Sequence, residues 1–421
     1  MNLNEQQKKA IEHFKGPCLV IGTPGSGKTR VITERVRYLV EEKGVKNTNI
    51  LVITFTKAAA VQMKKRYESM MGDASKRVYF GTFHAIFFTI LKYAYHYTAD
   101  NIIRDDTKRQ ILKELINKED IEIQDENDFL NDIEGEISRV KGEMIELQHY
   151  YSPNCPGESF RRIFTGYQKA LQGRKLIDFD DMLVYCYELL KAREDIRQMW
   201  HKQYPYILID EFQDINKVQY DIVKMLAAPE NNLFIVGDDD QSIYKFRGAD
   251  ISNILQFEKN FNNARVVKLE QNYRSTKTIL DAANEVIHNN KGRKDKTLWS
   301  DNEQGEKIDL YQAEDAYAEA DMVASTIKEN VDFGRADYSD YAILYRTNAQ
   351  SRALEEKLLL RNIPYKIIGG QNFYQRKEIK DVLCYLKTIA NGRDDLAVQR
   401  IINVPKRGIG AMSVARVNMF A

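Results

Sequence analysis

The segment Val20-Ile21-Gly22-Thr23-Pro24-Gly25-Ser26-Gly27-Lys28-Thr29 decides the fold of this chain. It fits the pattern G-x-x-x-x-G-K-[ST], in which backbone N–H groups of a glycine-rich loop surround a phosphate. The apolar residues 18–21 precede the loop as a predicted strand, and a helix whose N-terminus also favours an anion follows from Lys28. The pattern predicts a nucleotide site in which Lys28 contacts the β- and γ-phosphates and the Thr29 hydroxyl ligates Mg²⁺.

The composition is that of a folded protein with several domains. The chain has 421 residues, 43% of them hydrophobic and 29% charged, and this length accommodates about two to four domains. Lys and Arg number 62 against 61 Asp and Glu, so the formal net charge is +1. Because this balance gives no overall attraction to phosphate, nucleic-acid binding would have to come from a local groove and from aromatic stacking.

The sequence shows neither a membrane span nor a signal peptide. No apolar run reaches the roughly 20 residues of a spanning helix, and residues 1–7 are polar. The four cysteines are scattered without a C-x-x-C pair, which indicates neither a zinc site nor a disulfide framework. We therefore expect a cytoplasmic protein with no membrane partner.

Short apolar strands alternate with helical segments in two parts of the chain. The predicted strands are 18–21, 50–54 and 78–84 in the first part, and 206–209, 233–238 and 266–269 in the later part. This alternation predicts a parallel sheet with helices on both faces. Residues 85–176 lie between the two parts and show almost only helical periodicity, so a helical domain inserted into the sheet domain is expected.

A second α/β region is expected to begin past Arg274. Its predicted strands are 308–311, 341–345 and 365–368. From Glu378 onward the pattern is helical again.

Two adjacent carboxylates follow one of the predicted strands. The apolar residues 206–209 end in Asp210 and Glu211. With a phosphate-binding loop upstream, Asp210 is placed to hold Mg²⁺ through water, and Glu211 is placed to polarise the attacking water.

The motifs beyond the phosphate loop resemble a known family. Residues 210–214 (DEFQD) and 236–249 (VGDDDQSIYKFRGA) closely resemble superfamily 1 DNA helicases of the UvrD/PcrA/Rep type. Further similar segments follow in the family's order at 3–7, 54–60, 81–84, 177–183, 269–275, 342–352, 365–370 and 378–381.

This resemblance implies an α/β fold with two RecA-like lobes. The first would be a P-loop NTPase lobe with an inserted all-helical domain, and the second, incomplete lobe would lead into the start of a second helical insertion. The implied bounds are 1–85 and 178–272 for the first lobe, 86–177 for its insertion, 273–377 for the second lobe and 378–421 for the second insertion.

The resemblance also implies roles at the nucleotide. Gln7 would hydrogen-bond the adenine edge, Tyr273 would stack on the base, Gln241 would sense the γ-phosphate, and Arg274 would reach it from the second lobe. The implied catalytic residues are Lys28, Glu211, Gln241 and Arg274, and the Mg²⁺ ligands are Thr29 and Asp210. ATP would be held by Gln7, Gly22, Thr23, Pro24, Gly25, Ser26, Gly27, Lys28, Thr29, Arg30 and Tyr273.

Single-stranded DNA, alone or at a junction with duplex, is the implied partner, together with repair or replication proteins. Phe55, Tyr244 and Phe246 resemble the family's base-sandwiching aromatics, although the family often has Trp at the last position. Arg247 would support the strand or the lobe interface. For three further residues the choice between DNA contact and merely tying down a loop stays open: His84, Arg346 and Asn348.

The family continues with two motifs that are not present in this chain, one of which brings a second arginine to the γ-phosphate. We therefore expect the N-terminal portion of a longer helicase that moves 3′ to 5′ on single strands. Because one such arginine contributes about 10³–10⁵ in rate, we expect ATP binding to be retained and DNA-stimulated hydrolysis to be largely lost. Two alternatives are the motor of a recombination helicase–nuclease and a protein that binds ATP and single-stranded DNA without turnover.

Overall fold

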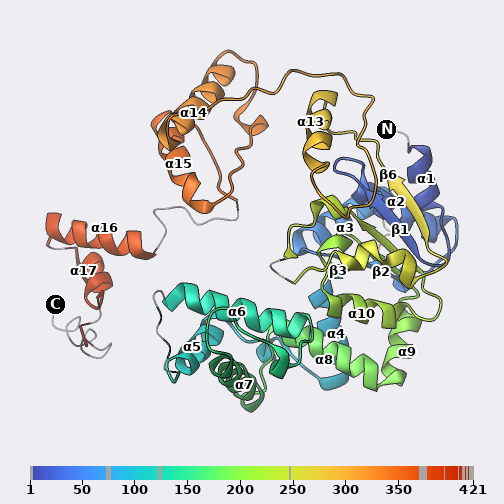
Figure 1. The fold of residues 1–421 in the computed structure, drawn as a ribbon, viewed down its shortest axis with the longest axis horizontal. Coiled ribbons are helices and arrows are strands. Elements are labelled where there is room, and N and C mark those ends of the chain that lie inside the picture. The colour runs from blue at the N-terminus through green and yellow to red at the C-terminus, as the bar shows by residue number, and fades with distance from the viewer. Residues whose placement is uncertain are drawn as a thin grey trace. The chain divides into compact units, whose positions relative to one another are not determined.

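The computed structural model describes residues 3–72, 77–119, 121, 123, 126–245, 248–368, 377–392, 394–405, 407–409, 413 and 416. The chain forms two compact units, Met1–Ile308 and Asp309–Ala421, called the first unit and the second unit below. Among the described residues, the β-sheet lies entirely in the first unit (Figure 1).

The first unit is built on a six-stranded parallel sheet in the order β3-β2-β4-β5-β1-β6. Its strands are β1 (Cys18–Gly22), β2 (Ile50–Thr54), β3 (Tyr79–Thr82), β4 (Tyr206–Ile209), β5 (Leu233–Gly237) and β6 (Arg265–Leu269). The register pairs Ile21 with Gly237, and Ile53 with Ile209. The loops that leave these strands therefore share one edge of the sheet, where ligands of open parallel sheets bind.

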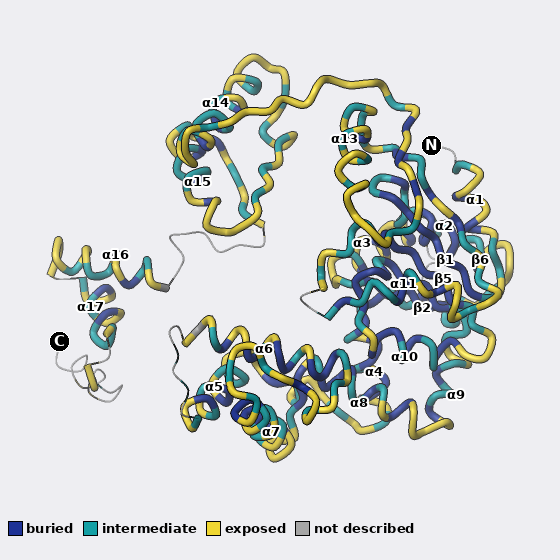
Figure 2. The backbone as a smooth tube through the Cα atoms, viewed as in Figure 1, coloured by how far each residue is buried: buried dark blue, intermediate teal, exposed yellow. Residues whose placement is uncertain are grey.

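Alternate strand residues serve two separate apolar clusters, as the two-residue period of a strand requires. In β1, Leu19 and Ile21 belong to one cluster, and Cys18 and Val20 belong to the other. Figure 2 shows the strands as the most buried part of the first unit. This burial on both faces confirms the predicted sheet with helices on each side.

Helices cover both faces of the sheet. On one face lie α1 (Glu5–Ile11), α2 (Lys28–Glu41) and α3 (Lys57–Met71). On the other lie α4 (Phe83–Tyr95), α8 (Phe179–Ala192), α9 (Glu194–Gln203), α10 (Lys217–Ala227), α11 (Ser252–Leu255) and α12 (Phe257–Asn260).

The expected helical insertion is present. It contains α5 (Asp105–Ile116), α6 (Glu126–Gly142) and α7 (Gly157–Gly173). Its own apolar cluster runs from Ile103 to Leu171, whereas α4 packs with the sheet. The buried Lys141 ammonium lies 2.7 Å from carboxylate oxygens of both Asp178 and Asp181, and so attaches α6 to the start of α8.

The segment after β6 belongs to the first unit as far as Ile308, past the boundary expected at residue 272. It contains α13 (Lys277–Ile287). Gln271 pairs with Trp299 in an isolated parallel bridge, and the Asn272 N–H donates to the Trp299 carbonyl at 2.7 Å. These contacts join residues 295–301 to the chain that leaves β6.

The second unit contains α14 (Ala316–Asp332), α15 (Ser351–Leu360), α16 (Lys377–Ala390) and α17 (Asp395–Ile401). Its small apolar cluster joins α14 and α15 through Ala324, Ile327, Leu358 and Ile363.

The three strands predicted for the second region, 308–311, 341–345 and 365–368, are wrong for this structure, because these residues form no strand. Leu310, Leu344 and Ile368 are 97%, 93% and 84% exposed. A strand requires a neighbour that takes up its N–H and C=O groups and covers its apolar side chains, and these segments pair with none among the described residues.

No helix among the described residues is both long enough and apolar enough to pass through a bilayer.

Candidate functional site

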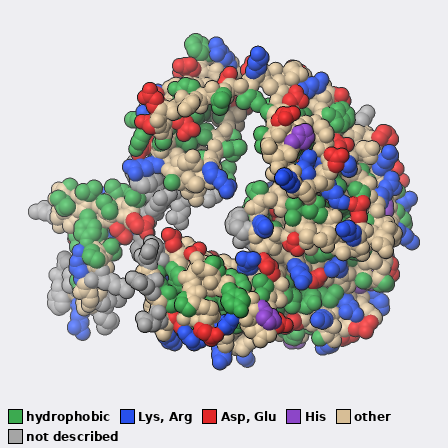
Figure 3. All heavy atoms as spheres, in the orientation of Figure 1, with side chains coloured by type: hydrophobic (Ala, Val, Ile, Leu, Met, Phe, Trp, Pro, Cys, Tyr) green, Lys and Arg blue, Asp and Glu red, His purple; other side chains and the backbone are tan. Residues whose placement is uncertain are grey.

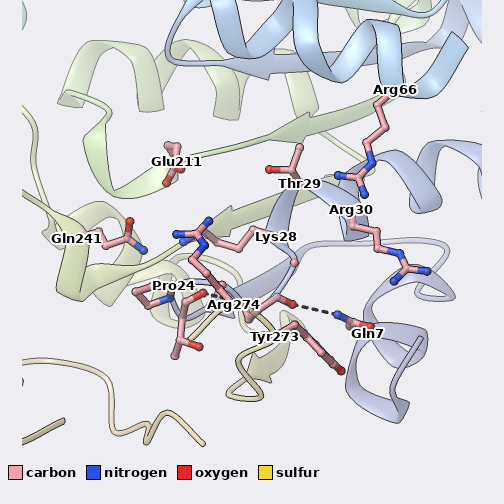
Figure 4. Close-up of a pocket in the computed structure, with 14 residues that line it drawn as sticks. Gln7, Pro24, Lys28, Thr29, Arg30, Arg66, Glu211, Gln241, Tyr273 and Arg274 are labelled. Carbon is pink, nitrogen blue, oxygen red and sulfur yellow. Dashed lines mark hydrogen bonds between the residues drawn. The ribbon is translucent and has the colours of Figure 1, made fainter. Parts of the chain in front are cut away.

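A cavity of about 410 Å³ opens at the carboxyl edge of the sheet in the first unit (Figure 4). Its lining comes from α1, the loop after β1, the start of α2, α3, the loops after β4 and β5, and the segment after β6. The lining residues are Gln7, Thr23, Pro24, Gly25, Ser26, Gly27, Lys28, Thr29, Arg30, Arg66, Glu211, Gln241, Tyr273 and Arg274. The structure thus brings together every predicted catalytic residue and every predicted nucleotide residue except Gly22, which does not line the cavity.

The loop after β1 has the backbone that an anion site requires. Gly25 and Gly27 have φ values of +70° and +84°, in the left-handed region that favours glycine. Gly27 caps α2 without a side-chain hydrogen bond, so the first N–H groups of the helix remain directed at the loop. A Cβ atom at Gly22 would lie 2.4 Å from Cγ of Lys28. Gly22 therefore makes room for the lysine, whose Nζ donates to the Gly22 carbonyl at 3.0 Å.

The carboxylates after β4 lie in contrasting surroundings. Asp210 is buried, and its Oδ1 has no hydrogen-bond partner. Burial and the neighbouring Glu211 charge raise the pKa of Asp210 to about 7, against the opposing effect of Lys28. Glu211 has a left-handed backbone with φ of +50° and is half-buried at the cavity wall. Asp210 is thus a buried carboxyl outside the cavity lining, whereas Glu211 lines the cavity beside Lys28 (Figure 4).

Gln213 connects the loop after β4 with the loop after β5. Its Nε2 donates to Glu211 at 2.9 Å, and its Oε1 accepts the N–H of Asp238 at 2.9 Å. Asp238 in turn accepts a 2.7 Å hydrogen bond from Nε2 of Gln241. A continuous chain of hydrogen bonds therefore runs from Glu211 to Gln241, the two residues predicted to act at the γ-phosphate.

Asn272 attaches Arg274 to the phosphate loop. Its Nδ2 donates to the Pro24 carbonyl at 2.7 Å, and its Oδ1 accepts the N–H groups of Arg274 and Ser275 at 2.7 and 2.8 Å. The Tyr273 N–H donates to the Gly25 carbonyl at 3.0 Å. Arg274 was expected to reach the cavity from a second lobe, but it lies in the first unit, and its backbone N–H is connected to the loop through Asn272. Asn272 lies in the segment 269–275, which resembles the family, but no role was predicted for it.

The predicted adenine contacts lie at one end of the cavity. Asn4 caps α1, and the side chains of Asn4 and Gln7 each accept the other's backbone N–H. Gln7 Nε2 also donates to the Ser26 carbonyl at 3.0 Å (Figure 4). Asn4 Nδ2 donates to the Tyr273 hydroxyl at 2.8 Å. Gln7 and Tyr273 are thus held against the phosphate loop from opposite ends of the first unit's sequence.

Arg66 is a cavity residue that sequence analysis missed. It belongs to the cluster Lys64-Lys65-Arg66, which looks like a solvated helix face. Its side chain is exposed and reaches the cavity from α3 (Figure 4). One feature of the sequence could have identified Arg66: it follows Met63, which is buried, by three residues. On a helix this spacing puts Arg66 at the border of the face that packs on the sheet.

Two of the predicted DNA-contacting aromatics meet in the structure. The rings of Phe55, after β2, and Tyr244, after β5, stack with centroids 5.4 Å apart and planes 20° apart. Phe246 and Arg247 lie outside the described residues.

The other predicted DNA contacts belong to two different units: His84 to the first, Arg346 and Asn348 to the second. His84 packs edge-on against Phe179 with ring centroids 5.5 Å apart, and burial lowers its pKa despite the nearby Asp180 charge. A largely neutral imidazole is a poor partner for a phosphate. Arg346 and Asn348 lie in the second unit, where the Gln350 side chain accepts the N–H of Arg346 at 2.9 Å.

Residues 3–262 match the UvrD/REP helicase N-terminal domain, and residues 267–420 match the UvrD-like helicase C-terminal domain. The chain belongs to the UvrD/REP helicase family. This confirms the resemblance noted in the sequence and the α/β fold expected from it.

Curated members of the UvrD/REP helicase family align with the whole chain. The chain is 44% identical over 437 aligned positions to the "ATP-dependent DNA helicase PcrA" of Staphylococcus aureus. It is also 44% identical, over 432 positions, to the protein of the same name from Staphylococcus epidermidis. In each case the alignment covers 100% of this chain and 58% of the relative. The chain therefore spans a little over half the length of these relatives.

Proposed function

We propose that the chain binds ATP with Mg²⁺ in the cavity of the first unit, binds single-stranded DNA at the Phe55–Tyr244 pair, and forms the motor part of a helicase that moves 3′ to 5′. One observation carries the proposal. Lys28, Glu211, Gln241 and Arg274 come from four separate segments and line one cavity. The direction of movement rests only on the family resemblance.

The cavity residues divide the work of phosphoryl transfer to water. The N–H groups of the phosphate loop and Lys28 would hold the β- and γ-phosphates. Glu211 would accept a proton from the attacking water, while Gln241 and Arg274 would stabilise charge on the transferred group. The hydrogen bonds through Gln213 and Asn272 fix these groups before substrate arrives, as electrostatic preorganisation requires.

The residues present fit a Mg²⁺ ion. The Oδ1 atom of the buried Asp210 has no hydrogen-bond partner and would be a ligand for the ion. Thr29, which would supply its hydroxyl, lines the cavity from the start of α2. Two protein oxygens suffice, because Mg²⁺ is commonly held by one or two of them together with phosphates and water. Bound there, Mg²⁺ would neutralise charge on the phosphates.

Aromatic stacking is the contribution to DNA binding for which the described residues provide a specific pair. On the face shown in Figure 3, Lys and Arg side chains are interspersed with Asp and Glu over the first unit. Stacking a base on an aromatic ring contributes about 1–3 kcal/mol, and opening a base-pair step costs on average about 1.4 kcal/mol. The free energy gained by stacking a freed base is therefore similar to the free energy needed to open a base-pair step. ATP would give the movement its direction by shifting the protein between conformations.

We also propose a cytoplasmic location and further binding partners. All four cysteines are described and free, as is usual in the reducing environment of the cytoplasm. Junctions of single-stranded and duplex DNA, and repair or replication proteins, are the partners that a motor of this kind would meet.

Binding and turnover measurements on the full chain test the proposal. We expect the wild-type chain to bind ATP and a labelled oligothymidylate with little DNA-stimulated phosphate release, and we expect Glu211→Gln to keep ATP binding while losing the residual release. Failure of the wild-type chain to bind either ligand would contradict the proposal. Strand displacement on a partly single-stranded duplex separates a helicase from a protein that binds both ligands without unwinding.

A further inference from the structure

The loop after β5 carries three consecutive carboxylates that are shielded from water. Asp238, Asp239 and Asp240 follow β5 directly, and the first two are 0% and 5% exposed. Adjacent like charges in a buried loop repel one another and lose their hydration. This loop therefore depends on cations supplied from elsewhere in the fold.

Lys296 is the buried cation at the centre of this cluster. Its side chain is 0% exposed, and its Nζ lies 3.2 Å from Asp238 and 2.9 Å from Asp240 and also contacts Asp239. Arg293 forms a bidentate pair with Asp240, at 2.7 and 2.6 Å. Arg293 stands beside Lys294 in the sequence, as in a solvated basic pair, yet its side chain is only 13% exposed.

The same loop leads to both proposed ligand contacts. One Asp238 oxygen lies 3.2 Å from Nζ of Lys296, and the other accepts a hydrogen bond from the side-chain amide of Gln241, which lines the nucleotide cavity. Three residues further on, Tyr244 stacks on Phe55. The position of the three aspartates therefore affects both the Gln241 amide, which faces the nucleotide cavity, and the Tyr244 ring, which stacks on Phe55.

We propose that Lys296 is a positioning residue that couples the nucleotide cavity to the DNA-contacting aromatic pair by holding Asp238, Asp239 and Asp240 in place. The inference deepens the proposed function and rests on it. Lys296 does not line the nucleotide cavity and is not part of the aromatic pair, so it would act through Asp238 on Gln241 and through the loop on Tyr244. The structure also supplies the reason for its burial, since one ammonium contacts all three carboxylates.

Lys294 provides a matched control two residues away. Its side chain pairs with Glu258 at a partly exposed position and does not contact the three aspartates. Its backbone N–H donates to Asp239 at 2.6 Å, and this bond survives side-chain substitution. Lys296→Met and Lys294→Met thus remove the same charge from one segment, and only the first removes it from the cluster.

Hydrogen exchange of the unliganded full chain tests the holding role. We expect Lys296→Met to accelerate amide exchange in residues 238–245 by about tenfold or more, because it leaves buried carboxylates uncompensated. Exchange in β1 and β2 should stay unchanged, as should exchange throughout Lys294→Met. Equal exchange of residues 238–245 in wild type and Lys296→Met overturns the inference. If Lys296→Met unfolds, Lys296→Met combined with Asp239→Asn carries fewer unpaired charges and takes its place.

Ligand coupling tests the consequence. The affinity for a fluorescein-labelled oligothymidylate is measured with and without AMP-PNP and Mg²⁺, and the ratio of the two affinities is compared between variants. We expect a ratio that differs from one by about fivefold or more in wild type and in Lys294→Met, and a ratio near one in Lys296→Met. A purely structural role would weaken binding without changing this ratio, and that result overturns the inference, as does a wild-type ratio of one. A wild-type chain that binds no AMP-PNP contradicts the proposed function instead, and the exchange experiment then decides the role of Lys296.

Discussion

At the scale of single residues, the site contains a carboxyl group whose surroundings disfavour its charge. Asp210 is buried beside Glu211, its Oδ1 is unpartnered, and its pKa is raised to about 7. A carboxyl group with a raised pKa in the fold binds a proton more tightly than the unfolded chain does. It therefore stabilises the fold at low pH and loses this contribution as pH rises toward 7.

Asp210→Asn should stabilise the metal-free protein in a pH-dependent way. The amide cannot ionise, so the gain over wild type should be largest above pH 7, on the order of a few kcal/mol, and should vanish toward pH 4. Denaturant unfolding in EDTA at several pH values measures this difference. A gain that is equal at all pH values would mean that the Asp210 charge is not the cause.

Arg66→Ala should weaken nucleotide binding. The guanidinium reaches the cavity from α3 and is a donor for phosphate or for a base edge, so its loss should reduce ATP affinity about tenfold. Lys65→Ala removes a neighbouring exposed charge that does not line the cavity and serves as the control. Equal ATP affinity of both variants, measured by titration with a fluorescent ATP analogue, would exclude a role for Arg66.

At the scale of elements, the carboxyl edge of the sheet holds the nucleotide cavity and the aromatic pair on neighbouring loops. Phe55 follows β2, and Tyr244 follows β5 beyond the cavity residue Gln241. Because β4 lies between β2 and β5 in the sheet, the two rings come from the strands on either side of the strand that leads to Glu211. A shift of the loop after β5 would therefore move both Gln241 in the nucleotide cavity and Tyr244 in the aromatic pair.

Tyr244→Ala should lower the affinity for single-stranded DNA and spare ATP binding. The loss of one stacking ring corresponds to about 1–3 kcal/mol, or roughly 5- to 150-fold. Phe14→Ala is the matched control, because Phe14 also belongs to a stacked pair, with Tyr206 at the amino end of β4. Fluorescence anisotropy with an oligothymidylate measures the effect, and an equal loss in both variants would refute a DNA role for the Phe55–Tyr244 pair.

The features that sequence analysis predicted well are local or depend on short spacing. Strands β1 to β6 were recognisable because buried parallel strands are short apolar runs, and the phosphate loop is a contiguous motif. Asn272, Lys296 and Arg66 were missed as functional residues because their roles depend on side chains far away in the sequence. The strand predicted at 341–345 was wrong because strand formation needs a pairing neighbour, which no segment of the described structure supplies.

At the scale of the whole molecule, every residue that lines the nucleotide cavity lies in the first unit, Met1–Ile308. Arg346 and Asn348, for which the choice between DNA contact and a loop contact is open, lie in the second unit. Nucleotide and DNA binding should therefore respond differently to substitutions in the second unit.

Arg346→Ala should leave ATP affinity unchanged and weaken single-stranded DNA binding by a few fold. If the guanidinium contacts a phosphate, the slope of log affinity against log salt concentration should fall by about 0.7. Titrations at several salt concentrations measure the slope. An unchanged slope, with unchanged DNA affinity, would mean that Arg346 only ties down its loop.

Equilibrium titration of the full chain with a fluorescent ATP analogue and Mg²⁺ tests the central claim most directly. Lys28→Ala removes the phosphate-loop ammonium, and Lys46→Ala removes an exposed lysine ahead of the amino end of β2. The wild-type chain and Lys46→Ala should bind the analogue equally, and Lys28→Ala should bind it about 10- to 100-fold more weakly. No binding by the wild-type chain, or equal binding by Lys28→Ala, would contradict the account.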